Sequence, residues 1–268
     1  MTAPDAQPCP TVSVVLPVFN AARHLPDLLR ALAAQRPEPP REIILVDSMS
    51  TDGTAAVAAG YEGQVRYLRQ PTAGPAATRN LGLGAAQGEF VAFLDADDLW
   101  HPEKLARQMA RFQARPDLDL CVTHVRHFWI SELSQEAARY RDHPRSRVMP
   151  GYYTSTLLAA RSLFDIVGEF NSALWHSDAT DWFLRAAERR AVMELLPDVL
   201  TYHRLHHTNL SRRLAGASRD EYVQLLKATL DRRRRFDEAA AQSREFRDSE
   251  RGQQGQSPGA GASSHVDY

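Results

Sequence analysis

The chain has 268 residues, 43% hydrophobic and 24% charged, so it can bury a sizeable core and is predicted to be a globular protein. Its formal net charge of −1 excludes a general electrostatic attraction to nucleic acid or to anionic membranes. No apolar run approaches the roughly 18 residues of a membrane span. The first ten residues do not resemble a signal peptide, and Cys9 and Cys121 form no CxxC pair. We therefore expect a soluble protein in the reducing cytoplasm.

Strands and helices are predicted to alternate through the first part of the chain. Strands are predicted over TVSVVLP, where Pro17 is expected to stop the strand, and over REIILVD, QVRYLRQ and EFVAFLD. Helices are predicted over ARHLPDLLRALAAQ, after the Thr51-Asp52-Gly53 turn, over GPAATRNLGLGAAQ and over HPEKLARQMARFQ. This alternation predicts an α/β fold with a mostly parallel central sheet and helices on both faces.

The second part of the chain is less regular. LDLCVTHVRHFWI predicts one or two strands, and the polar stretch 132–150 has no assignment. A helix is expected around TDWFLRAAERR, and VMELLPDVLTYH predicts one or two further strands. From Asp220 onward, Tyr222, Leu225, Leu226, Thr229 and Leu230 recur at the spacing of one amphipathic helix.

Three carboxylates, Asp95, Asp97 and Asp98, crowd the end of the apolar strand in FVAFLDADD. Such crowding is unfavourable because like charges repel and burial opposes ionisation, and a helix cap accounts for only one of the three. Three other classes of protein fit the sequence poorly. The chain has no GxxxxGK[ST] motif of a P-loop triphosphatase, and DADDLW has no Thr at the short spacing that an aspartyl phosphatase needs. The glycines of LGLGAAQG precede a strand, whereas those of a dinucleotide-binding fold follow one. The remaining interpretation of these carboxylates is a binding site for a hard cation, Mg²⁺ or Mn²⁺, together with a phosphorylated ligand.

Other polar residues are expected beside these carboxylates. Phe19 and Asn20 follow the first strand, and Asp47 ends the second. Because ligands of such sheets bind beyond the carboxyl ends of the strands, these residues are predicted to converge on one crevice.

Five motifs occur in one order along the chain: PVFN (17–20), ILVDSMSTDGT (44–54), AGPAATRNLGL (73–83), FLDADDLW (93–100) and VGEF (167–170). Together they resemble a family 2 glycosyltransferase, an inverting enzyme with the GT-A fold, and the resemblance extends over residues 11–211. It implies a donor half at 11–98 and an acceptor half at 99–211. The remaining segments are expected to be a disordered N-terminus (1–10), a helical extension (212–246) and a disordered tail (247–268).

The resemblance also implies roles for individual residues. Asp97 would coordinate a divalent metal, Asp95 would touch the ribose or a metal-bound water, and His206, in a segment like RxHxxN, would contact the metal or the diphosphate. The alternatives are a turn residue at Asp52, a helix-surface residue at Arg79 and a solvated loop residue at His206. The residues assigned to donor binding are Pro17, Phe19, Asn20, Asp47, Asp52, Gly74, Arg79 and Asp95.

Two aspartates are candidates for the general base that the transfer requires. WHSDATDWFLR resembles the Glu-Asp motif of the family, and alignment through Asp181 places Asp178 where the family has Glu and Ala179 where it has the catalytic Asp. Asp181 and Asp178 both remain candidates, and the alternative for each is a helix cap.

The resemblance predicts transfer of one sugar from a nucleoside diphosphate sugar, a UDP-sugar in the first place, to a hydroxyl acceptor with inversion. A glycan, a lipid-linked acceptor and a small molecule all fit as the source of this hydroxyl group. Two alternatives are a glycosyltransferase-like protein that only binds nucleotide or glycan, and, more distantly, a nucleotidyltransferase. Trp100 and Trp182 are expected to be packing residues. The run 232–235 of four arginines is a solvated helix face or a peripheral contact with anionic lipid at the inner face of the membrane.

Overall fold

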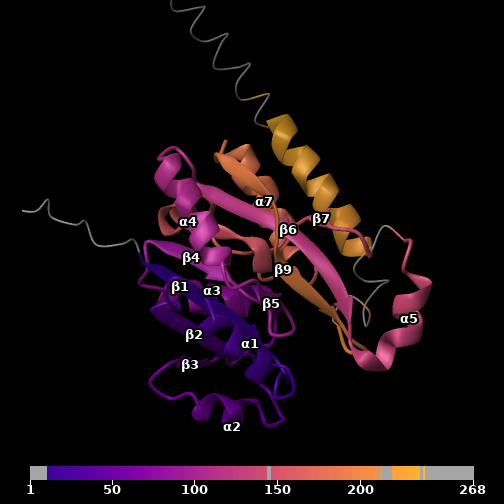
Figure 1. Cartoon of the computed structure of the whole chain (residues 1–268). Helices are drawn as coiled ribbons and strands as arrows, with labels where there is room; N and C mark the ends of the chain where they lie inside the picture. Colours follow the sequence, from indigo (N-terminus) through magenta and orange to yellow (C-terminus); the bar gives the residue numbers. More distant parts are fainter. Residues whose placement is uncertain (1–10, 144–145, 210–211, 213–218, 236–237, 239–268) are drawn as a thin grey trace, which may run out of the picture. The chain divides into compact units, whose positions relative to one another are not determined.

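A computed structural model of the chain describes residues 11–143, 146–209, 212, 219–235 and 238 (Figure 1). The chain forms two compact units, Met1–Tyr222 and Val223–Tyr268. The predicted disordered segments 1–10 and 247–268 lie outside the described residues, and the predicted boundaries at 98 and 211 stay predictions.

The first unit is built on a nine-stranded sheet in the order β3-β2-β1-β4-β8-β6-β9-β5, with β7 paired to β6. The strands are β1 (Val12–Val18), β2 (Glu42–Asp47), β3 (Arg66–Arg69), β4 (Phe90–Phe93), β5 (Leu99–Trp100), β6 (Leu120–Trp129), β7 (Met149–Pro150), β8 (Leu158–Ala160) and β9 (Met193–Leu205). The first four strands are parallel, as predicted. The whole sheet is mixed rather than mostly parallel, because β8 is antiparallel to both β4 and β6, and β5 is antiparallel to β9.

Helices lie on both faces of the sheet, as predicted, since successive residues of a strand point to opposite faces. Val14 of β1 belongs to a core shared with the first and fourth helices, whereas Val15 belongs to a core shared with the third, sixth and seventh. Trp100 and Trp182 are buried in these cores, as expected for packing residues. The helices are α1 (Leu25–Ala33), α2 (Thr54–Ala59), α3 (Pro75–Ala85), α4 (Lys104–Ala114), α5 (Ser134–Arg139), α6 (Arg161–Val167) and α7 (Asp178–Glu188), with 3-10 turns η1 (Ser131–Leu133) and η3 (Thr154–Thr156).

The structure changes several element boundaries. β1 does not stop at Pro17 but continues to Val18, because pairing with β4 ends at Val15 and the missing proline N–H therefore interrupts no ladder on that side. Residues 120–129 form one strand, and the segment 132–150, which had no assignment, contains α5 and β7.

The second unit is described over the helical residues 223–235 and at residue 238. These described residues are helical, as predicted, whereas the amphipathic character of the helix and the bounds of the extension at 212–246 stay predictions. Thr229 donates a hydrogen bond to the Leu225 carbonyl at 2.9 Å, and Val223, Leu226 and Leu230 are exposed.

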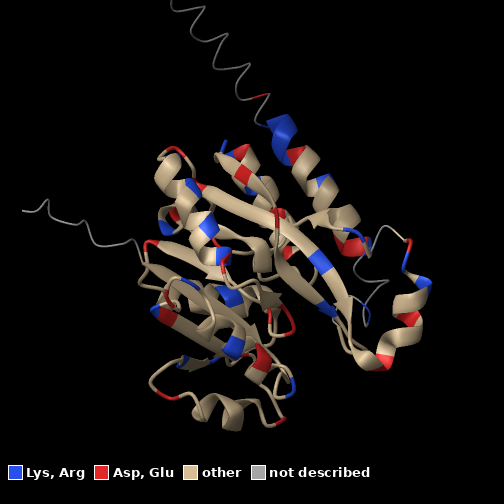
Figure 2. Ribbon diagram, viewed as in Figure 1, with Lys and Arg blue, Asp and Glu red and all other residues tan. Residues whose placement is uncertain are grey.

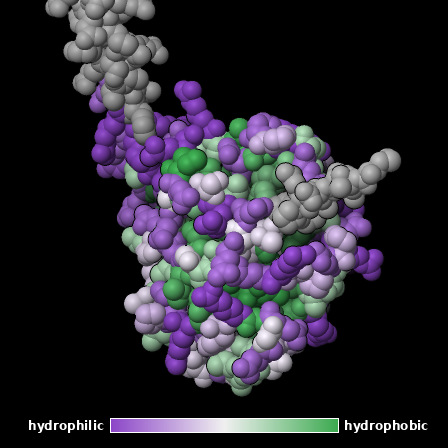
Figure 3. Space-filling view, turned by 90° about the vertical axis from the view of Figure 1, so that its left-hand side faces the viewer, coloured by the Kyte–Doolittle hydropathy of each residue, from purple (hydrophilic) through white to green (hydrophobic). Residues whose placement is uncertain are grey.

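Charged residues of both signs are interspersed over the strands and helices, in keeping with the net charge of −1, and the basic run 232–235 stands out in blue (Figure 2). On the face shown in Figure 3, hydrophobic side chains occur in small groups separated by hydrophilic ones. Among the described residues, no helix is both long and apolar enough to cross a bilayer.

Candidate active site

The ends of β1, β2 and β4 lie side by side in the sheet. Val18 pairs with Asp47, and Val15 pairs with Phe93, so the loops that follow these strands leave the same edge. The first two loops are joined by Asn20, whose side-chain oxygen accepts a hydrogen bond from the Thr51 amide at 2.9 Å. The structure thus brings the predicted donor-binding loops together.

Asp47 is the last residue of β2 and is 2% exposed. Its carboxylate accepts hydrogen bonds from the Ser50 amide at 2.8 Å and from the Tyr67 hydroxyl at 2.7 Å. Burial and the neighbouring carboxylate raise the pKa of Tyr67 to about 12. Pro17 is half-buried, whereas the Phe19 side chain is 54% exposed and open to a ligand.

Asp52 joins the loop after β1 to the start of α2. One carboxylate oxygen accepts from the Thr54 amide at 2.9 Å, and the other accepts from the Ala22 amide at 3.1 Å. Burial opposes ionisation, but the bonds from Thr54 and Ala22 outweigh it and lower the pKa of Asp52. Both carboxylate oxygens of Asp52 therefore bond to loop backbone, as expected for the alternative in which Asp52 is a turn residue.

Arg79 connects two halves of the site. Gly74 has a φ of 138° and, with Pro75, begins α3, which carries Arg79 into the interior. The guanidinium, in a residue 7% exposed, lies 2.8 Å from Asp95 and 2.5 Å from Asp178. Burial disfavours its charge, but the two carboxylates more than offset this and raise the pKa of Arg79. The structure therefore excludes a helix-surface position for Arg79.

Asp97 and His206 are in direct contact beyond the end of β4. His206 Nε2 lies 2.9 Å from Asp97 Oδ2, which also accepts from the Asn209 amide at 2.9 Å. Burial opposes ionisation of Asp97, but the contact with His206 and the nearby His203 lower the pKa of Asp97. His206 is 8% exposed, so it is not a solvated loop residue.

This pair fits a hard divalent cation whose remaining ligands come from water and phosphate. The Asp97 carboxylate and the His206 imidazole, both of which are metal-ligand types, lie 2.9 Å apart. Among the described residues, no group of three His, Cys, Asp or Glu side chains forms a closed metal cage. The Asp95 carboxylate, predicted to touch the ribose or a metal-bound water as part of the metal site, bonds to Arg79 through its Oδ1, and its predicted role stays a prediction.

Asp98, the residue after Asp97, forms a second pair with His203. Asp98 is fully buried, and its Oδ1 lies 2.7 Å from His203 Nδ1. Burial raises the pKa of Asp98; burial lowers that of His203, but the Asp98 charge outweighs it and raises the pKa of His203 to about 9. Sequence reasoning missed His203 and Asn209, although Asn209 ends the RxHxxN-like segment that pointed to His206.

The two candidate bases have different partners. Asp178, the first residue of α7, faces Arg79 and is 4% exposed. Asp181, one turn further along, lies 2.8 Å from Arg185, whose guanidinium also donates to the carbonyls of Val167 and Glu169. The structure therefore brings Asp178 to Arg79, beside Asp95, and brings Asp181 close to the VGEF segment through Arg185.

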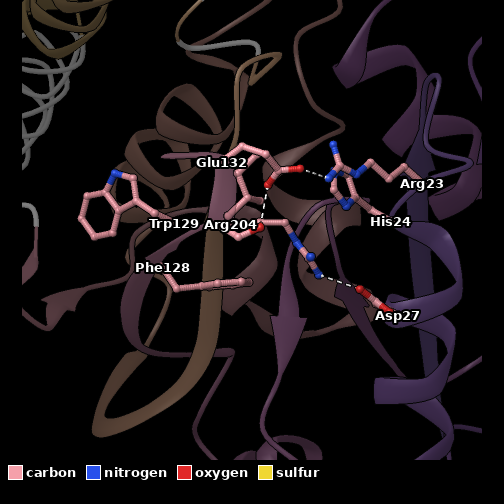
Figure 4. Close-up of a pocket in the computed structure, with 9 residues that line it drawn as sticks. Arg23, His24, Asp27, Phe128, Trp129, Glu132 and Arg204 are labelled. Carbon is pink, nitrogen blue, oxygen red and sulfur yellow. Dashed lines mark hydrogen bonds and ion pairs between the residues drawn. The ribbon is translucent and has the colours of Figure 1, made fainter. Parts of the chain in front are cut away.

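A groove of about 360 Å³ lies between the start of α1 and the ends of β6 and β9 (Figure 4). Two ion pairs cross it, Arg23 with Glu132 and Arg204 with Asp27, the latter at 3.4 Å. Arg204 also donates to the Asp97 carbonyl at 3.2 Å, so the groove adjoins the Asp97 and His206 pair. Its lining residues are Arg23, His24, Asp27, Phe128, Trp129, Ile130, Ser131, Glu132 and Arg204.

Known proteins resemble this chain in sequence. TuaG of Bacillus subtilis, named for teichuronic acid biosynthesis, is 41% identical over 105 residues, which cover 37% of this chain and 41% of TuaG. An uncharacterized glycosyltransferase of Nostoc sp. is 26% identical over 224 residues, covering 78% of this chain and 69% of the relative. The match to TarS of Staphylococcus aureus, a poly(ribitol-phosphate) β-N-acetylglucosaminyltransferase, spans only 17% of that longer protein.

Solved structures share the fold. TarS 1–349 of S. aureus, in complex with UDP-GlcNAc, superposes with a TM-score of 0.60 at 21% identity, covering 74% of this chain and 60% of that one. Glucosyl-3-phosphoglycerate synthase of Mycobacterium tuberculosis, in complex with Mn²⁺, UDP and phosphoglyceric acid, gives 0.58 at 20% identity, covering 82% and 78%. The predicted GT-A fold is confirmed. The family model "Glycosyl transferase family 2" matches residues 13–171, more than half of the chain, and the chain therefore belongs to glycosyl transferase family 2.

Proposed function

We propose that the protein transfers one sugar from a nucleoside diphosphate sugar, with UDP as the favoured nucleotide, to a hydroxyl acceptor with inversion at the anomeric carbon. The observation that carries this proposal is the buried chain of contacts from Asp95 through Arg79 to Asp178, next to the facing pair Asp97 and His206. A carboxylate base and a cation site at the edge of one sheet are what a nucleotide-sugar transfer requires.

The donor would bind at the ends of β1 and β2. Asp47 and Asn20 would contact the base, with the exposed Phe19 beside it, and Gly74 would let the ligand approach the start of α3 closely. Support for UDP comes from the structural relatives, which were crystallised with UDP or UDP-GlcNAc. An ordinary turn role for Asp52 is enough to explain its contacts, so its part in donor binding would be indirect.

Asp97 and His206 would hold a divalent metal ion, Mg²⁺ or Mn²⁺. When bound, such an ion neutralises the developing charge on the leaving diphosphate. Asn209 would orient Asp97 through the hydrogen bond that its side-chain amide donates to the same carboxylate oxygen. Metal-bound crystals of the mycobacterial synthase support this assignment.

The transfer would be a single displacement with Asp178 as the general base. The Asp178 carboxylate takes the proton of the acceptor hydroxyl, the acceptor oxygen bonds to the anomeric carbon, and the bond from that carbon to the diphosphate oxygen breaks. The products are the glycoside and a nucleoside diphosphate, and attack from the opposite face inverts the anomeric centre. Asp178 is favoured over Asp181 because its partner Arg79 also contacts Asp95 at the end of β4, whereas the partner of Asp181, Arg185, contacts the backbone of Val167 and Glu169.

The test is a thermal-shift series with UDP, GDP, dTDP and CDP, each with and without Mn²⁺, because a ligand that binds the folded protein raises its melting temperature. UDP with Mn²⁺ is expected to give the largest shift, and Asp97→Ala is expected to abolish the metal-dependent part. Asp117→Ala is the matched control, since this exposed carboxylate pairs with Arg115 on the surface. No shift with any nucleotide would refute the donor site.

Hydrolysis of the bound donor then separates an enzyme from a protein that only binds nucleotide. A family 2 enzyme without its acceptor is expected to release UDP slowly from a UDP-sugar, with water as the acceptor. Binding without any release, with every UDP-sugar offered, would favour the non-catalytic alternative, and release of pyrophosphate from a triphosphate would favour a nucleotidyltransferase.

A further inference from the structure

The segment that begins α7 is held by a carboxylate from a distant part of the chain. Glu221 Oε2 accepts a hydrogen bond from the Trp175 amide at 2.9 Å. Its Oε1 accepts from the His176 amide at 2.8 Å and from the Ser177 amide at 2.6 Å. All three donors and Glu221 belong to the first compact unit.

Three properties make this a strong contact. The acceptor is charged, and hydrogen bonds from amides to a carboxylate are stronger than those between neutral groups. The carboxylate stands at the start of α7, where the helix dipole favours a negative charge. Ser177, the N-cap residue of α7, makes no capping bond with its own side chain, so its backbone at the helix start is held by Glu221 instead.

The contact leads directly to the candidate base. Asp178 is the residue after Ser177, and it bonds to Arg79, which in turn bonds to Asp95. The Asp181 amide donates to the Ser177 carbonyl at 2.8 Å and thereby closes the first turn of α7. The position of Asp178 therefore depends on the backbone that Glu221 holds.

We propose that Glu221 is a positioning residue that fixes the backbone at 175–177 and thereby orients Asp178 against Arg79 for proton transfer. This inference rests on the proposed function for its catalytic consequence, but the contact itself can be measured without activity. Burial opposes ionisation of Glu221, whereas the three amide bonds outweigh it and lower the pKa of the carboxyl group, as a charged acceptor requires.

The experiment compares the full chain with Glu221→Ala, Glu221→Gln and the matched control Asp220→Asn. Asp220 is the adjacent exposed carboxylate and makes none of the three bonds to residues 175–177. Amide hydrogen exchange is followed at Trp175, His176, Ser177 and Asp181. In Glu221→Ala these amides are expected to exchange roughly 10- to 100-fold faster, with an intermediate effect in Glu221→Gln and none in Asp220→Asn.

Donor hydrolysis provides the catalytic readout. In Glu221→Ala, kcat is expected to fall by about tenfold or more because the base is less well oriented, while the KM for the UDP-sugar and the melting temperature change little. A merely structural role would instead lower the melting temperature and weaken UDP binding as well.

Equal exchange rates in Glu221→Ala and the wild type would overturn the proposal. Faster exchange with an unchanged kcat would also overturn it, because the contact would then not position the base. If the wild type itself hydrolyses no donor, the proposed function fails, and the exchange at Asp181 still decides whether Glu221 orders the first turn of α7.

Discussion

At the scale of single residues, the site depends on how charged side chains are paired. Arg79 is buried between Asp95 and Asp178, and each of these contacts compensates for the burial of a charge that would be unfavourable alone. Asp181 is also buried, but Arg185 neutralises it and carries the contact to the backbone of Val167 and Glu169. Two aspartates three residues apart thus have separate surroundings, one beside Arg79 and the other beside Arg185 and the segment 167–169.

The proposed roles of these aspartates can be separated with two equivalent substitutions in α7. Asp178→Asn is expected to lower kcat for donor hydrolysis by about 10²- to 10⁴-fold because the amide cannot accept the proton, with the UDP-induced thermal shift retained. Asp181→Asn is expected to lower the free energy of unfolding by about 1–3 kcal/mol and to reduce kcat less. Kinetics and urea unfolding of both variants measure this, and the reverse pattern would make Asp181 the base.

At the scale of elements, α3 must lie close to the sheet to bring Arg79 to the strand ends. Gly82, on the same helix, permits this close approach. A Cβ at Gly82 would overlap the Val15 side chain of β1 and come within 3.1 Å of Val46 Cγ2 of β2. Gly84, two residues further along, faces open space, since a Cβ there meets nothing within 4 Å among the described residues.

Alanine at these two glycines should therefore have opposite effects. Gly82→Ala is expected to destabilise the protein by about 1–3 kcal/mol because the packed core must shift. Gly84→Ala is expected to stabilise it by up to about 1 kcal/mol, since alanine is the better helix former. Urea unfolding measures both changes, and a neutral Gly82→Ala would show that α3 lies further from the sheet.

At the scale of the whole first unit, hydrogen bonds that start from a buried lysine connect α4 with β6 and η3. Lys104 of α4 is fully buried, donates to Gln108 at 2.7 Å and lies 4.0 Å from the centre of the Trp100 ring. Gln108 in turn donates to the carbonyls of Cys121 in β6 and Thr156 in η3. Burial lowers the pKa of Lys104 to about 7.

This pKa predicts how stability varies with pH. The folded-state pKa lies below the ordinary value of 10.5, so between about pH 7 and 10.5 the unfolded state binds more protons. The unfavourable contribution of Lys104 is complete below pH 7 and disappears as the pH rises to 10.5. Lys104→Met is expected to be more stable than the wild type by on the order of 1–4 kcal/mol at pH 6, with the difference shrinking towards pH 10.

Urea unfolding between pH 6 and 10 measures the difference. Lys227→Met, at an exposed lysine, is the control and should leave the pH dependence unchanged. A constant difference between Lys104→Met and the wild type would mean that the buried amine keeps an ordinary pKa.

The amino-acid sequence is enough to predict the four strand–helix pairs, the order of the motifs and the convergence of Asn20, Asp47 and Asp95 at the carboxyl ends of neighbouring strands. These features follow from local periodicity and from the geometry of parallel strands, which a single chain already encodes. Local spacing also placed Asp178 and Asp181 at the start of one helix, but it left both as candidate bases.

The contacts between side chains in the site depend on how distant segments pack in three dimensions. Arg79 and Asp178 are 99 residues apart, and Asp97 and His206 are 109 residues apart, so no local pattern relates them. Their contacts arise because β8 and β9 return to the sheet and bring α7 and the segment after β9 to the ends of β1 and β4. The mixed sheet and the support that Glu221 gives to α7 have the same origin, since both depend on packing between distant segments.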